Sequence, residues 1–147
     1  MDFSIVNWWA VLIGVVLSIV SGFIWYSPNV FFNTWWNGLQ KKEDATGSEE
    51  EMKNSMIYIM GLTVLTSFTM ATTVAMLTPL LSSVMSTGEV TVTSGALTGF
   101  MLWLGLIVPS NLVNKLFAGY KPSVFFIEIG NHLINMVVYG VVVGLFA

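Results

Sequence analysis

Four long runs of apolar residues divide this chain, and polar segments separate them. The apolar runs cover about residues 6–26, 54–80, 94–117 and 122–146, and the helices that they predict cover about 6–26, 49–80, 94–117 and 122–146. Each is long enough to cross a bilayer as a helix, because a spanning helix needs about 20 predominantly apolar residues. The pattern therefore predicts an all-α membrane protein in which residues 1–147 form a single domain of four transmembrane helices.

A shorter amphipathic helix is predicted directly after the first run, over about residues 28–39. Large aromatic side chains recur there at helical spacing while asparagine and threonine take the opposite face, as in helices that lie in a membrane interface. Ser27 is predicted to be the N-cap of this helix and Pro28 its first residue, where the missing N–H is not needed. The predicted interfacial anchor consists of Trp25, Tyr26, Phe31, Phe32, Trp35 and Trp36.

Polar residues also mark the start of the second run. Ser48 is followed three residues later by Glu51, which is the spacing of a capping box. The second helix is therefore expected to begin at about residue 49, in water, and to enter the bilayer about a turn and a half later.

Composition agrees with a membrane location and excludes several kinds of chemistry. Only 9% of the residues are charged, against roughly 25% in an average soluble domain. The chain has no cysteine, which excludes disulfides, thiolate catalysis and cysteine-based metal sites. There is no basic patch that would suggest nucleic-acid binding, and neither a cofactor nor a metal site is predicted. The expected partner is the lipid bilayer.

The lysines predict how the helices are oriented in the membrane. With four spans, all five lysines fall on or beside one side, while both termini and the loop 81–93 fall on the other. Lysine-rich segments favour the cytoplasmic face. We therefore expect both termini outside, in a multi-pass protein of the cell membrane, meaning the plasma or inner membrane. The lysines are Lys41, Lys42, Lys53, Lys115 and Lys121.

Candidate chemistry lies in the last two runs, which a short turn joins into an antiparallel hairpin. At about 1.5 Å per residue, Asn111 and Glu128 lie at matched depths and His132 lies close to the midplane. Glu128 and His132 share one helix face because they are four residues apart. The candidate ion or proton path consists of Glu128, His132, Asn131, Asn111, Asn114 and Asn135.

Two interpretations of this polar group remain open. Ionisable residues at such depth are costly and are by default a functional hypothesis, here a proton relay or a cation site with Glu128 as the charge. Alternatively the group is structural, with Glu128 protonated or reaching toward the inner surface and His132 neutral and hydrogen-bonded. One histidine and one embedded carboxylate do not complete the usual catalytic constellations, so an enzyme is not predicted.

Small residues recur at four-residue intervals in every predicted span, and such faces let helices approach closely in lipid. The first functional hypothesis is therefore a protein that acts through helix packing, as a homo-oligomer or as an accessory subunit of a membrane complex. The second is a small proton or cation transporter or channel that uses Glu128 and His132. The small residues are Gly14, Ser18 and Gly22 in the first span, Ser67, Ala71 and Ala75 in the second, Gly95 and Gly99 in the third, and Gly140 and Gly144 in the fourth.

Two stretches carry a family resemblance. The first is NWWAVLIGVVLSIVSGFIWYSPNVFFNTWW, with its Asn-Trp start and Trp-Tyr-Ser-Pro motif, and the second is WLGLIVPSNLVNKLFAGYKPSVFFIEIGNHLINMVVYGVVVGL. Both resemble the DUF1761 family of small four-helix membrane proteins, which implies a four-span bundle without an established activity. Glu128 and His132 are not part of the pattern that carries the resemblance. The matching positions are Trp8, Trp25, Tyr26, Ser27, Pro28, Trp103, Pro109, Asn114, Phe117 and Gly130.

Overall fold

A computed structural model describes residues 3–39, 49–85 and 88–147, with side chains from residue 4 onward except those of 49–56. Helices make up nearly all of this part of the chain. Ser48 and the side chain of Glu51 lie outside the described residues, so the predicted capping box stays a prediction. The elements are η1 (Phe3–Ile5), α1 (Trp8–Trp25), α2 (Phe32–Gly38), α3 (Glu49–Val84), α4 (Val92–Leu102), η2 (Trp103–Ile107), α5 (Val108–Ala118) and α6 (Pro122–Leu145).

Four helices in the structure are long and apolar enough to cross a membrane. They are Trp8–Trp25, Ile57–Val84, Val92–Ala118 and Pro122–Leu145, the third being formed by α4, η2 and α5 in sequence. The second of them continues through Pro79 to Val84, beyond the expected end near residue 80. The architecture is thus all-helical, with four membrane-length helices.

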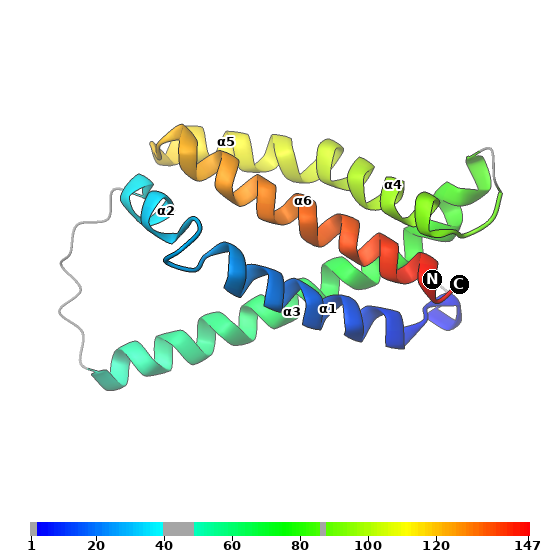
Figure 1. Cartoon of the computed structure of the whole chain (residues 1–147), viewed down its shortest axis with the longest axis horizontal. Coiled ribbons are helices and arrows are strands. Elements are labelled where there is room, and N and C mark those ends of the chain that lie inside the picture. The colour runs from blue at the N-terminus through cyan, green and yellow to red at the C-terminus, as the bar shows by residue number, and fades with distance from the viewer. Residues whose placement is uncertain (1–2, 40–48, 86–87) are drawn as a thin grey trace.

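Helix α6 lies at the centre of the arrangement. Figure 1 shows α1 along one side of α6 and the α4–η2–α5 helix along the other, with both termini at the same end of the molecule. We call this the terminal end. The opposite end holds α2, Lys115 and the turn between α5 and α6, and we call it the lysine end.

Glycines allow α4 and α6 to pack backbone against backbone. A Cβ atom on Gly95 would overlap the carbonyl group of Gly140, and a Cβ atom on Gly140 would overlap that of Gly95. The helices can therefore approach this closely only because both positions lack a side chain. Two further contacts of this kind join Gly99 to the Met136 carbonyl and Gly144 to the Thr91 carbonyl.

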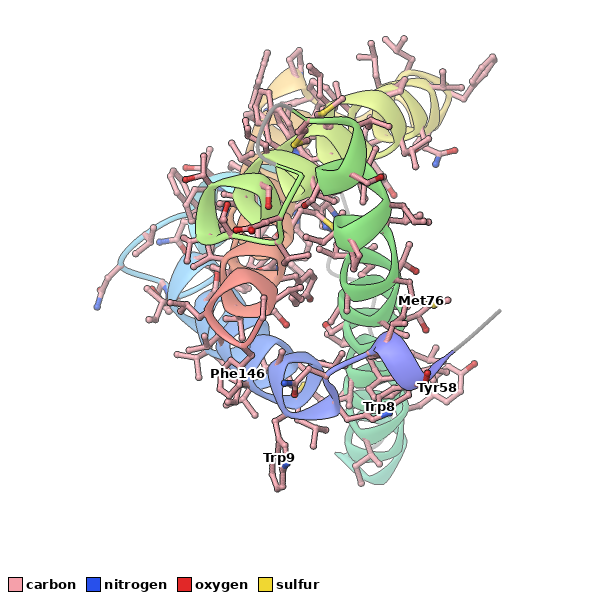
Figure 2. The ribbon with its side chains drawn as sticks, turned by 90° about the vertical axis from the view of Figure 1, so that its right-hand side faces the viewer. Trp8, Trp9, Tyr58, Met76 and Phe146 are labelled. Atoms are coloured by element: carbon pink, nitrogen blue, oxygen red, sulfur yellow. The ribbon has the colours of Figure 1, made fainter. Side chains whose placement is uncertain are left out.

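Helix α1 packs on another face of α6 through a large buried side chain. Tyr139 is 2% exposed, and its ring lies against Gly14 of α1, where a Cβ atom would come within 3.0 Å of it. Trp8 stacks on Phe68 of α3 with ring centroids 6.1 Å apart. Seen from the terminal end in Figure 2, Trp8 lies against α3 while Trp9 points away from the bundle. Figure 1 shows the first part of α3 diverging from the other helices.

The wide helical turn of η2 precedes Pro109. Proline cannot donate a backbone hydrogen bond inside a helix and its ring crowds the preceding turn. Here the chain adopts a π-helical segment over Trp103–Ile107, a rare form that occurs mostly as a single turn within an α-helix. Side chains then cover the nearby carbonyls: Ser110 donates to Leu106 and Asn111 donates to Ile107.

The predicted start of the short helix at Ser27 and Pro28 is wrong. Helix α2 begins at Phe32, its N-cap is Phe31, and no side chain caps it. The backbone N–H of Phe31 instead donates to the carbonyl of Trp25, and the two rings lie 4.6 Å apart between centroids. Because the chain folds back on the end of α1 in this way, Ser27 and Pro28 form a turn and cannot begin a helix.

Candidate functional site: a carboxylate centre at the lysine end

Glu128 is held by two side chains from other helices. Its Oε2 lies 2.7 Å from Nζ of Lys115 on α5, and its Oε1 accepts a hydrogen bond of 3.0 Å from Nε1 of Trp35 on α2. The side chains of Lys115 and Glu128 are only 18% and 16% exposed. One carboxylate thus ties together the ends of α2, α5 and α6, and charge-assisted contacts of this kind are stronger than neutral ones.

Aromatic rings surround this ion pair. Nζ of Lys115 lies 4.9 Å from the centroid of the Tyr120 ring, within the range of a cation–π contact. Tyr26, which directly follows α1, meets Trp35 edge to face with centroids 5.2 Å apart. Burial first, and then the negative charge of Glu128, raise the pKa of the Tyr26 phenol well above its ordinary value. We call Glu128, Lys115, Trp35, Tyr26 and Tyr120 the carboxylate centre.

Two more indoles fix α6 beside the carboxylate centre. Nε1 of Trp25 donates to the carbonyl of Ile127 at 2.9 Å, and Nε1 of Trp103 donates to that of Ile129 at 2.8 Å. The predicted anchor residues Trp25 and Trp35 therefore bond to α6, while Trp36 is 41% exposed. Their placement in a membrane interface stays a prediction.

Polar side chains continue along α6 toward the middle of the helix. Asn135 donates to Oδ1 of Asn131 at 3.2 Å, and Asn131 donates to the hydroxyl of Ser21 on α1 at 3.5 Å. His132 is partly buried one turn beyond Glu128. Oδ1 of Asn135 and Oγ1 of Thr72 are buried without a hydrogen-bond partner among the described residues. Buried acceptors of this kind usually bond to water.

The structure brings together only part of the predicted path. Glu128, His132, Asn131 and Asn135 follow one another on α6, but Asn111 bonds back to its own helix and Asn114 is exposed. The partner of Glu128 is Lys115, a residue that was predicted only to mark the cytoplasmic side. The position of Lys115 in the sequence could have indicated this pairing. Lys115 lies three residues before the end of α5, and its long side chain covers the difference in depth to Glu128.

Two cavities of the described part of the chain lie away from the carboxylate centre. One of about 520 Å³ opens at the terminal end between Asn7, Pro79, Glu89 and Phe146. Another of about 180 Å³ lies between α3 and η2. Neither is lined by Glu128 or His132. Within the described part of the chain, no group of three or more acidic or histidine side chains could hold a metal ion.

Part of α3 is not covered by any other helix. Every side chain from residue 57 to 66 of α3 is exposed, a stretch that we call the α3 arm. Ile57 and Tyr58 are 63% and 67% exposed, and Leu65 is 59% exposed. Gly61 has no atom within 4 Å of the place where a Cβ would be. The hydroxyl of Thr63 donates to its own helix carbonyl at Ile59, so it needs no partner.

The fold and the carboxylate centre define a class: a small all-helical protein with four membrane-length helices, tied at one end by an ion pair between α5 and α6. The particular family follows from comparison with known sequences. The family DUF1761, described as "Protein of unknown function", matches residues 9–144, and the chain belongs to it. The resemblance is thereby confirmed over nearly the whole chain. No curated protein and no solved structure matches significantly.

Proposed function

We propose that this protein is a non-enzymatic integral membrane protein that acts through helix packing, by pairing with a second copy through the α3 arm. One observation carries the proposal: ten consecutive side chains of the α3 arm, residues 57–66, are exposed, and this uncovered stretch contains Gly61. Gly61 offers a place where another helix can approach closely. Two-fold pairing of identical surfaces is the commonest form of oligomer.

The state of the carboxylate centre supports this proposal. Both oxygens of Glu128 are engaged, by Lys115 and by Trp35, so the carboxylate holds helix ends together. In this proposal the termini lie outside, α2 lies at the cytoplasmic interface of the plasma or inner membrane, and the α3 arm faces the partner.

Cysteine cross-linking tests the pairing cleanly because the chain has no cysteine of its own. Single cysteines placed at Tyr58, Gly61, Leu62 and Leu65 should give disulfide-linked dimers in native membranes, with yields that follow helical periodicity. Mass measurement in mild detergent should give twice the 16.2 kDa of one chain.

Matched control positions lie on the exposed face of α1. Leu12 and Val16 are 49% and 58% exposed, similar to the α3 arm, and cysteines there should give little dimer. Equal cross-linking from both helices, or a monomeric mass without cross-links, would overturn pairing through the α3 arm. A stable complex with a different membrane protein would replace the second copy by an accessory-subunit role.

A second candidate function is a proton or cation path through Glu128 and His132. It is favoured by the unpartnered acceptors of Asn135 and Thr72, which suit bound water near the middle of the helices. Under this candidate, Glu128→Gln abolishes proton or cation flux into proteoliposomes while the protein stays folded. Unchanged flux in this variant would remove the candidate.

A further inference from the structure

Lys115 occupies the carboxylate centre in the way that a bound cation would. Its ammonium contacts Oε2 of Glu128 at 2.7 Å and lies 4.9 Å from the Tyr120 ring centroid. The other carboxylate oxygen is oriented by Trp35. A carboxylate beside aromatic rings is a combination that binds ammonium groups in proteins. In this structure the protein's own side chain fills such a site.

Lys115 has an alternative position that Glu128 lacks. It lies three residues before the end of α5 at Ala118, on a flexible stem, so its ammonium can reach water at the lysine end. Glu128 lies six residues into α6, about 9 Å from the helix start, and its short side chain cannot follow. An ammonium group from a ligand could therefore take the place of the Lys115 ammonium beside the carboxylate, while Lys115 moved into water.

The geometry also selects the kind of ammonium. A nitrogen–oxygen distance of 2.7 Å requires an N–H donor, which a quaternary ammonium does not have. The partial exposure of Glu128 and Lys115 shows that the pair can be reached from the surface. We propose that the carboxylate centre binds a primary alkylammonium group, which enters from the lysine end and displaces Lys115 from Glu128. A free amine and the headgroup of phosphatidylethanolamine both present this group.

Chemical rescue of a lysine variant tests the site. Lys115→Ala removes the internal ammonium and leaves its place at Glu128 empty. In mild detergent, n-butylammonium chloride should raise the thermal midpoint of this variant by roughly 2–4 °C more than equal concentrations of sodium chloride or n-butanol. The wild type, in which Lys115 competes, should respond less.

Two matched variants separate the site from general salt effects. Lys115→Ala combined with Glu128→Gln lacks the carboxylate and should show no rescue. Lys121→Ala removes an exposed lysine at the start of α6 and should also show none. Equal responses to n-butylammonium in all variants, or to n-butanol and n-butylammonium alike, would overturn the proposal.

Lipid composition distinguishes the two sources of the ammonium. In nanodiscs, stabilisation of Lys115→Ala by phosphatidylethanolamine relative to phosphatidylcholine indicates the lipid headgroup, whereas rescue by n-butylammonium in both lipids indicates a free amine. Absence of both effects contradicts the site. If Lys115→Ala does not fold, Lys115→Met with methylammonium as the probe replaces it, under the same criteria. The proposal is independent of pairing through the α3 arm, because none of its measurements depends on oligomeric state.

Discussion

Helices α3 and α6 have the same mean hydropathy over their membrane-length parts, yet they are packed very differently. Over the 18-residue stretch that is most apolar in each helix, 33% of α6 is buried, against 17% of α3. A high hydropathy means that a helix is more stable in lipid than in water. Lipid alone provides that environment, so no neighbouring helix is needed. The difference comes from position, because α6 is the central helix that contacts α1, α3 and α4, and glycines that meet other backbones and indoles that bond to α6 hold it there. Both features are lacking along the α3 arm.

The largest expected change in stability separates two equivalent substitutions, one glycine to alanine on α6 and one on α3. Gly140→Ala places a Cβ against the carbonyl of Gly95, so α4 and α6 must separate, and we expect a loss of about 3 kcal/mol in the free energy of unfolding. Gly61→Ala on the α3 arm meets no atom within 4 Å in a single copy, so in micelles dilute enough to separate a dimer it should be neutral or slightly stabilising. Reversible unfolding in mixed micelles measures both. Equal losses would mean that the two helices are packed alike.

A smaller effect is expected at the ion pair that anchors α6. Glu128→Gln leaves the ammonium of Lys115 partly buried without its counter-charge, which should cost about 2 kcal/mol. Adding Lys115→Gln removes the unpaired charge and should restore much of that loss. Lys121→Gln, at an exposed position, serves as the control and should change stability little. Additive effects of the two substitutions at Glu128 and Lys115 would show that their contact contributes nothing.

The smallest effect concerns Tyr26, whose phenol is held neutral beside Glu128. Its pKa is raised in the folded protein above the ordinary 10.0, so the stability that it contributes is complete below pH 10 and is lost as the pH rises beyond 10. Tyr26→Phe should change the free energy of unfolding by less than about 0.5 kcal/mol at pH 7. Above pH 10 the free energy of unfolding of this variant should fall less steeply than that of the wild type. Unfolding curves from pH 8 to about 11 test this. Parallel curves for the two proteins would contradict it.

Apolar length made the four membrane-length helices predictable, since each run has to satisfy its backbone internally once it leaves water. The π-helical form of Trp103–Ile107, directly before Pro109, was not predicted. Ser27 and Pro28 were wrongly predicted to begin a helix. Local capping preferences favoured that start, and the contact between Trp25 and Phe31, which folds the chain back on α1, outweighed them.

The candidate site could be predicted only along α6. Glu128, His132, Asn131 and Asn135 belong to one helix, so their mutual spacing is fixed by the helical repeat. Lys115, Trp35 and Tyr26 reach Glu128 from other helices, and the angle at which those helices approach is not contained in any local pattern. Matching of depths suggested Asn111 as the neighbour of Glu128, whereas the length of the lysine side chain brings Lys115 there instead.

The bonds from Trp25 and Trp103 have a consequence for motion. They end on the carbonyls of Ile127 and Ile129, and two residues correspond to about 200° around a helix axis. The two indoles therefore bond to α6 from nearly opposite sides. Rotation of α6 about its axis, or translation along it, has to break at least one of these hydrogen bonds. A change of shape would therefore leave α6 in place and move the α3 arm, whose residues 57–66 are exposed throughout.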